Sequence, residues 1–258
     1  MIFSRSNKNL VSRHLQDRGY IMKETKFWII AALAMVCLLA GGMNVNAADK
    51  SLTARQEAII PIAAFAATGN TQQLLTALEA GLKAGLTVNE IREELIQIYA
   101  YAGFPRSLTA LNVFMNLLEE RKKQGINDAL GPEPAAVAKD TDRNALGTRI
   151  QTELTGAPVK GALFEFAPAI DAFLKEHLFC DIFSRGVLSN QDRELTTISA
   201  LAALPAPDQL RAHLRISLHT GITPHELEQY IDVLKNQVGD KPAELARTAL
   251  AEVLGQSR

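Results

Sequence analysis

Two stretches of this chain repeat one pattern of residues, and this repeat constrains the fold more than any other feature. When Leu52 is placed over Leu188, the two stretches align without a gap as far as Ile91 over Leu227. A duplicated unit explains so many matches at one fixed offset better than chance does. The matched pairs include Ile62 with Ile198, Ala64 with Ala200, Gln73 with Gln209, Leu74 with Leu210, Leu78 with Leu214 and Leu82 with Leu218.

Each copy carries the sequence signals of helices. The repeated leucines recur at a spacing of four, which lays an apolar stripe along a helix. Gly85 and Gly221 stand where a left-handed residue ends a helix. A T-x-x-E spacing follows each glycine and is typical of a capping box at the start of the next helix. We therefore predict an all-α fold built from two tandem units. The capping pairs are Thr87 with Glu90 and Thr223 with Glu226, and similar helix starts are expected at Thr53 with Gln56 and Ser189 with Asp192.

The segment between the copies is charged and rich in helix-breaking residues. It contains Gly125, Gly131, Pro132 and Pro134, which together are typical of a solvated linker. We place the first unit at residues 48–120, the linker at 121–160 and the second unit at 161–258.

The N-terminal region has the pattern of a secretory signal peptide. Lys23 and Lys26 precede an apolar run over residues 27–40, and small residues follow as far as Ala47. The run is shorter than the roughly 20 residues that span a bilayer. We predict that residues 1–47 are an extension and signal peptide, that Met22 is the true start, and that the protein is exported to the bacterial periplasm without stable membrane association. An uncleaved anchor is the alternative.

The charge balance and the cysteine count exclude several classes of protein. With 27 Lys and Arg against 28 Asp and Glu, the chain has no global charge to attract nucleic acid, so no nucleic-acid partner is expected. Cleavage after Ala47 would remove Cys37 and leave Cys180 alone, so no intramolecular disulfide is expected. The spacing of His213, His219 and His225 does not match a helical metal pair, so we predict no metal site.

Glu194 and His213 are the strongest candidates for chemistry. Their helical positions put both on or beside faces that should be buried. A carboxylate near an imidazole suits general acid–base work. A structural core pair would leave the same pattern, and the sequence leaves both interpretations open.

The two copies differ at these positions. Ala58 and Ala77 replace the Glu and the His in the first copy. The first copy instead has Tyr101 in the sequence Tyr-Ala-Gly-Phe-Pro, where the second copy has Gln237. Each copy holds what the other lacks, so we predict one composite site where they meet.

These segments resemble the carboxymuconolactone decarboxylase family. The resemblance covers roughly residues 52–120 and 165–250. It implies all-helical units of the alkylhydroperoxidase D-like fold that pair into oligomers, with a tandem copy acting as a pseudo-dimer. The segments that carry it are Ser184-Arg185, Arg193-Glu194, residues 210–215, residues 221–223, Glu226-Leu227 and residues 101–105, which resemble the family's Y-A-G-x-P signature.

The related alkylhydroperoxidase D branch reduces peroxides with two cysteines, a Glu and a His. By resemblance, its Glu and His fall on Glu194 and His213, but its cysteines fall on Ala206 and Gln209. Without two thiols there is no dithiol–disulfide cycle, so we disfavour peroxiredoxin-like antioxidant activity, which stays an alternative. We interpret Cys180 as a core residue and keep a redox role as a further hypothesis.

By resemblance, His213 is the expected proton-transfer residue, with Glu194 as its partner. We expect a carboxy-lyase acting on a small carboxylated or lactone-type molecule, with no metal or organic cofactor. A non-catalytic ligand-binding scaffold is the other alternative, and we expect a homo-oligomer, for example a trimer of pseudo-dimers. The candidate substrate-binding residues are Arg193, Arg211, Tyr101 and Asp181, with Arg215 as a further arginine able to hold a carboxylate; at least one arginine is expected to be only a solvated residue.

Overall fold

The computed structural model describes residues 50–255, and every regular element among them is a helix. The predicted all-α fold is therefore confirmed. The predicted extension and signal peptide, residues 1–47, lie outside the described residues. None of the described helices combines the length and apolar character that a bilayer crossing requires.

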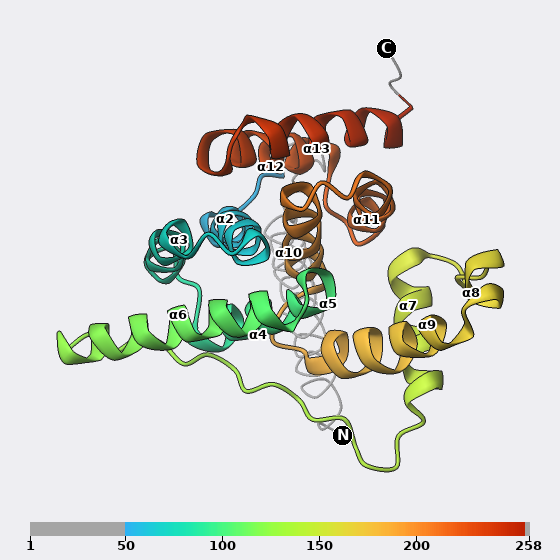
Figure 1. The fold of residues 1–258 in the computed structure, drawn as a ribbon, viewed down its shortest axis with the longest axis horizontal. Helices are drawn as coiled ribbons and strands as arrows, with labels where there is room; N and C mark the ends of the chain where they lie inside the picture. Colours follow the sequence, from blue (N-terminus) through green and yellow to red (C-terminus); the bar gives the residue numbers. More distant parts are fainter. Residues whose placement is uncertain (1–49, 256–258) are drawn as a thin grey trace, which may run out of the picture. The chain divides into compact units, whose positions relative to one another are not determined.

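The two copies fold into matching series of helices (Figure 1). The first copy contains α2 (Ala54–Thr68), α3 (Thr71–Lys83), α4 (Val88–Gln97), α5 (Tyr99–Ala102) and α6 (Phe104–Lys123). The second contains α10 (Asn190–Ala203), α11 (Pro207–His219), α12 (Pro224–Val233), the π-helix η4 (Leu234–Val238) and α13 (Asp240–Val253).

Helix α7 lies inside the span that we expected to be a linker. Only residues 124–142 of that span run without helix before α7 begins. Helix α7 packs against η2, and a Cβ on Gly147 would lie 1.7 Å from the backbone oxygen of Lys175. Gly147 therefore allows two helices to approach closely. The elements between the copies are α7 (Arg143–Thr155), α8 (Ala162–Phe166), α9 (Pro168–Ala172), the π-helix η2 (Phe173–Ile182) and the 3₁₀ helix η3 (Phe183–Arg185).

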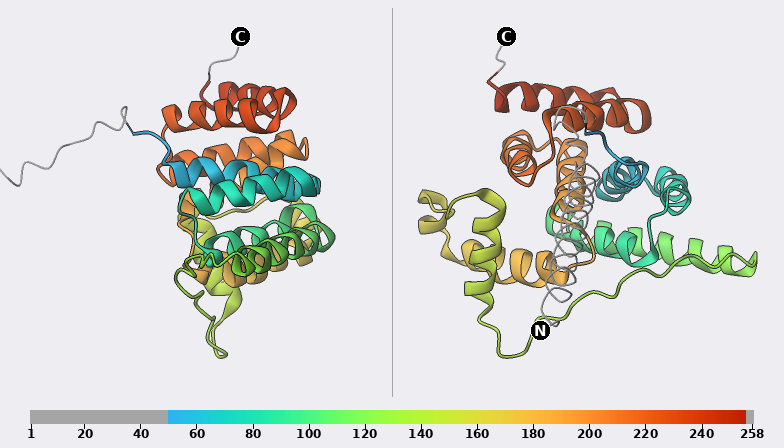
Figure 2. Two further views of the ribbon diagram at one scale, coloured as in Figure 1. Left: turned by 90° about the vertical axis from the view of Figure 1, so that its left-hand side faces the viewer. Right: turned by 180° about the vertical axis from the view of Figure 1, so that it is seen from behind.

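The equivalent helices α2 and α10 pack against each other at the centre of the core. Residues 58–67 of α2 and 192–202 of α10 are buried without interruption. A helix buried on all sides must lie between other elements. Here α12 and α13 cover the pair on one side and α4, α5 and α6 on the other (Figures 1 and 2).

The predicted caps form in both copies. Thr87 with Glu90 and Thr223 with Glu226 make complete capping boxes. Gly85 and Gly221 adopt φ angles of 93° and 94°, in the left-handed region that favours glycine. The equivalent turns therefore have the same backbone geometry.

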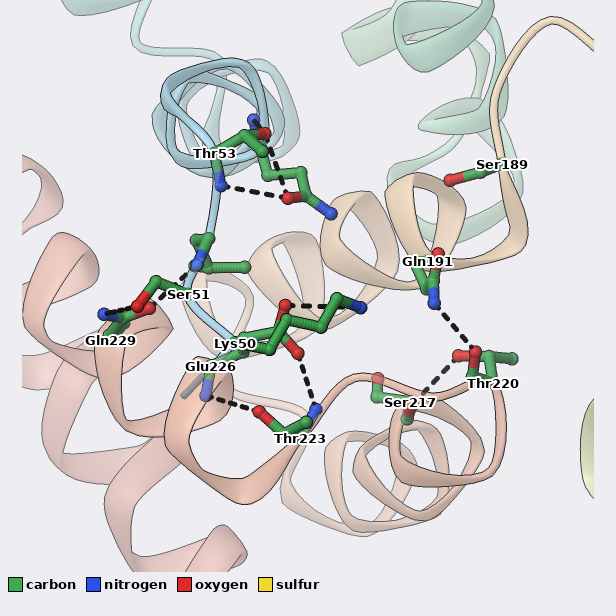
Figure 3. A network of polar contacts seen from close by, with 12 residues as sticks. Lys50, Ser51, Thr53, Ser189, Gln191, Ser217, Thr220, Thr223, Glu226 and Gln229 are labelled. Atoms are coloured by element: carbon green, nitrogen blue, oxygen red, sulfur yellow. Dashed lines mark hydrogen bonds and ion pairs between the residues drawn. The ribbon is translucent and has the colours of Figure 1, made fainter. Parts of the chain in front are cut away.

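Each copy sends the segment before its first helix onto the other copy. The Leu52 backbone N–H donates to Gln229 Oε1 at 2.8 Å, and Lys50 Nζ lies 3.5 Å from Glu226 Oε1. Figure 3 shows Lys50 beside Glu226, and Ser51 beside Gln229. In the opposite direction, Arg185 donates to Glu93, the residue equivalent to Gln229. This exchange is the arrangement expected of a pseudo-dimer.

Candidate functional site

The predicted acid–base pair forms between adjacent helices α10 and α11. His213 Nδ1 lies 2.9 Å from Glu194 Oε2. The Glu194 side chain is 1% exposed and the His213 side chain is 13% exposed. Because a carboxylate can only accept, Nδ1 donates the proton, and Nε2 points away from Glu194. The imidazole therefore has one nitrogen held by the protein and one available for a ligand.

The first copy contributes Tyr101 to the same site. Its ring meets the His213 ring edge-on, with 5.8 Å between centroids and planes at 82°. The Tyr101 hydroxyl is buried and has no hydrogen-bond partner among the described residues. Burial, and then the charge of Glu194, raise the pKa of this hydroxyl above its usual range. The structure thus brings together residues of both copies, as the composite site requires.

Arg193 lies on α10 beside Glu194, and its side chain is fully buried. Its Nη1 donates to Gln97 Oε1 at 3.0 Å, and Nη2 lies 3.6 Å from Glu93 Oε2. Within residues 50–255, its Nε and Nη2 find no hydrogen-bond acceptor. The guanidinium also lies over the ring of Phe183, 5.4 Å from its centroid. Burial lowers the pKa of Arg193 to about 10, which leaves it charged at neutral pH.

Glu93 lies between Arg193 and a second arginine, Arg185, and contacts both. Arg185 donates from Nε to Glu93 Oε2 at 2.8 Å and from Nη2 to Oε1 at 2.9 Å. Such a bidentate contact fixes the carboxylate strongly. The Glu93 side chain is 1% exposed, so the carboxylate supplies negative charge to the interior beside Arg193. The junction of the copies is therefore held by a row of alternating charges.

Three candidate residues lie outside this cluster. Arg211 pairs with Asp208 and with Glu252, the latter at 3.1 Å. Asp181 pairs with Arg143 and accepts from His177 Nδ1 at 2.9 Å. Arg215 is exposed. Arg211 and Asp181 thus have ion-pair partners of their own, and their role in substrate binding stays a prediction.

Cys180 is fully buried on η2, and it is the free cysteine of the described residues. Burial raises the pKa of its thiol. The described residues contain no group of three or more His, Cys, Asp or Glu side chains arranged to hold a metal ion. The candidate chemistry therefore centres on the imidazole, the phenol and the buried guanidinium.

Sequence reasoning missed the part that α4 plays in the site. Glu93 and Gln97 both hold Arg193, and Gln97 Nε2 also donates to the Arg193 carbonyl at 2.8 Å. The neighbouring Glu94 is fully buried, and neither of its side-chain oxygens has a hydrogen-bond partner in the part of the chain that the structure describes. Glu94 follows Ile91 by three positions and precedes Ile98 by four, so a carboxyl group on the apolar face of this helix was the available signal.

Burial, and then the nearby charge of Asp192, raise the pKa of Glu94 well above the usual carboxyl range. A protonated carboxyl group is less costly to bury than an ionised one. The second copy has Tyr230 at the equivalent position, and its hydroxyl donates to the Ile198 carbonyl at 2.9 Å. The two copies thus fill one buried position with different polar groups.

This geometry suits proton transfer next to a bound anion. An imidazole held through Nδ1 can give a proton from Nε2. The phenol and the guanidinium are hydrogen-bond donors, which suit an electron-rich oxygen of a ligand. The site therefore has an acid–base group and donors side by side.

Comparison with known proteins gives two matches. The model of the Carboxymuconolactone decarboxylase family matches residues 33–115 and again residues 168–252. A protein of Acinetobacter baylyi named 4-carboxymuconolactone decarboxylase is 31% identical to the chain over 96 residues. That alignment covers 36% of this chain and 72% of the relative.

Proposed function

Since the chain belongs to the carboxymuconolactone decarboxylase family, we propose that it is a carboxy-lyase that acts on a small carboxylated lactone through His213. The observation that carries the proposal is the contact of His213 with Glu194 on one side and Tyr101 on the other. A core pair alone does not explain why a tyrosine of the other copy covers the imidazole.

The proposed reaction breaks the bond between the substrate carboxylate and its neighbouring carbon. Carbon dioxide leaves, and the electron pair moves into the conjugated carbonyl group and gives an enolate. Protonated His213 then gives a proton from Nε2 to the carbon, and solvent restores the proton to the imidazole. Glu194 holds the ring in place through Nδ1 and balances the charge of the imidazolium. Each turnover consumes one proton and releases one carbon dioxide.

Turnover of 4-carboxymuconolactone, followed as carbon dioxide release, tests the proposal. We expect His213→Ala to lower kcat by at least about a hundredfold, the size of a general-acid contribution. His213→Gln keeps a hydrogen-bonding group opposite buried Glu194, so it separates catalysis from folding. His225→Gln, at an exposed residue of α12, is the control and should retain activity. Full turnover by a folded His213→Gln protein would refute the proposal.

A non-catalytic ligand-binding scaffold is the second candidate. The observation that favours it is the replacement of the Glu and the His by Ala58 and Ala77 in the first copy. The scaffold hypothesis predicts that the unmodified chain binds small carboxylates saturably and releases no carbon dioxide. A peroxiredoxin-like activity lacks support because Ala206 and Gln209 stand at the cysteine positions.

Export to the periplasm, assembly into a homo-oligomer and a cofactor-free reaction stay predictions. The first rests on the sequence pattern of residues 23–47, and the other two on family resemblance. Cell fractionation and the mass of the purified protein in solution would test export and assembly.

A further inference from the structure

Three buried polar atoms at the junction of the two copies lack hydrogen-bond partners among the described residues. They are the hydroxyl of Tyr101 and the Nε and Nη2 atoms of Arg193. Buried polar groups without partners are rare in folded proteins, and each calls for an explanation. Tyr101 comes from the first copy and Arg193 from the second, so the explanation concerns their junction.

The neighbouring side chains are already committed to other contacts. The Thr197 hydroxyl gives its one proton to the Arg193 carbonyl at 3.0 Å and accepts from Gln97 Nε2 at 3.0 Å. Glu194 accepts from His213. The Tyr101 hydroxyl has Thr197 as a neutral neighbour, and Arg193 Nη2 has Glu93 Oε2 at 3.6 Å, but none of the described residues forms a hydrogen bond to the Tyr101 hydroxyl or to Arg193 Nε.

The unpartnered atoms share one chemical character, because a phenol hydroxyl and a guanidinium can both donate. Tyr101 meets the ring of His213, and Arg193 directly precedes Glu194, the partner of His213, on α10. The charge of Arg193 also acts on the Tyr101 hydroxyl. A group that satisfies both must be an acceptor, and a negatively charged oxygen gains most from such donors.

We propose that Tyr101 and Arg193 form an oxyanion site beside His213, which binds the charged oxygen of a planar, conjugated anion such as an enolate. The catalytic role of this site rests on the proposed function, but anion binding by it does not. Donors fixed in a water-poor site stabilise charge that develops in a reaction more than donors in water do. Tyr101 would then hold the enolate oxygen while His213 protonates the carbon.

Both donors keep their protons under working conditions. Burial raises the pKa of Tyr101, so the hydroxyl stays a neutral donor. Arg193 keeps its charge at neutral pH, and the neighbouring His213 side chain is 13% exposed, so the imidazole reaches solvent.

The equivalent junction in the other direction lacks both donors. Gln237 replaces the tyrosine, and Glu57 replaces the arginine. A carboxylate at the position of the guanidinium would repel an anion. The site therefore exists once in each chain.

Binding of 4-nitrophenol tests the proposal without turnover. Its phenolate is planar, carries a delocalised negative oxygen and absorbs visible light, so a titration gives a Kd. We expect saturable binding of the phenolate, and Tyr101→Phe should raise the Kd about ten- to hundredfold, the value of a hydrogen bond to a charged group.

Tyr99→Phe is the matched control. Tyr99 lies on the same short helix, and its hydroxyl is also buried without a hydrogen-bond partner among the residues described. Its ring, however, lies near His177, with 5.5 Å between centroids. Residues two positions apart do not share a helix face, so this variant should bind the phenolate like the unmodified chain. Absence of saturable binding, an unchanged Kd in Tyr101→Phe or an equal loss in Tyr99→Phe would overturn the proposal. Binding that depends on Tyr101 in a protein that releases no carbon dioxide would support the oxyanion site and reject the decarboxylase.

Discussion

The two junctions between the copies are built from equivalent helices but differ in the polar side chains at equivalent positions. One joins Tyr101 of the first copy to Glu194 and His213 of the second. At the equivalent positions of the other stand Gln237, Ala58 and Ala77. Caps, glycine turns and leucine stripes are kept in both.

This difference separates what the fold needs from what a site needs. A helix stripe can be filled by any apolar residue of suitable size, so both copies retain it. A buried Glu and His are costly unless they pair, and neither is required for packing. A fused pair can therefore keep the polar side chains of a site at one junction and only the packing residues at the other.

The largest effect on stability that we predict concerns Glu93 and its equivalent Gln229. Glu93→Gln removes the carboxylate that faces Arg185 and fully buried Arg193. Because an uncompensated charge stays inside, the free energy of unfolding should fall by about 3 kcal/mol. Gln229→Ala loses only neutral contacts with Ser51 and Leu52 and should cost about 1 kcal/mol. Urea unfolding measures both, and equal losses would contradict the charge assignment.

A smaller effect, with a pH dependence, should distinguish Glu94 from Tyr230. Burial in the folded chain raises the pKa of Glu94 well above 4.5, the ordinary value that it keeps in the unfolded chain. Between these two pKa values the folded state holds a proton that the unfolded state has lost, so stability falls as pH rises. Glu94→Gln should remove this slope and stabilise the chain by about 2 kcal/mol near neutral pH.

Tyr230→Phe is the comparison for this experiment, because it removes a neutral hydrogen bond to Ile198. It should cost about 1 kcal/mol and leave the pH dependence unchanged. Thermal unfolding from mildly acidic to mildly basic pH measures both variants. Parallel curves for Glu94→Gln and the unmodified chain would show that Glu94 does not hold the proton.

The smallest effect is expected at Cys180, where no change in turnover should follow Cys180→Ser or Cys180→Ala. Burial raises the pKa of the thiol, and the described residues hold no second cysteine with which Cys180 could run a disulfide cycle. Rates of carbon dioxide release and of peroxide reduction would be measured side by side. A folded variant that loses either activity would revive the redox hypothesis.

The sequence predicted the helices well because their signals are local. Capping boxes and left-handed glycines act over a few residues, and the repeat supplied each signal twice. The contact between Tyr101 and His213 across the junction was also predictable, since each residue is missing from the other copy.

Side-chain partners were harder to predict because they depend on packing between distant segments. Arg211 is two positions from His213 and so lies on another face of α11, where it meets Asp208 and Glu252. Asp181 forms an ion pair with Arg143 of α7, and that helix was not predicted because the segment has the composition of a linker. Glu93 and Gln97 reach Arg193 across the junction, and nothing local to α4 indicates that contact.

The most direct test of the composite site compares Tyr101→Phe with Gln237→Phe in the decarboxylation assay. Tyr101 belongs to the copy without the imidazole, and Gln237 is its exposed equivalent. If one site forms from both copies, Tyr101→Phe should lower kcat by about a hundredfold, the effect of losing one oxyanion donor, while Gln237→Phe leaves kcat unchanged. An unchanged kcat in Tyr101→Phe, or equal losses in the two variants, would contradict the account.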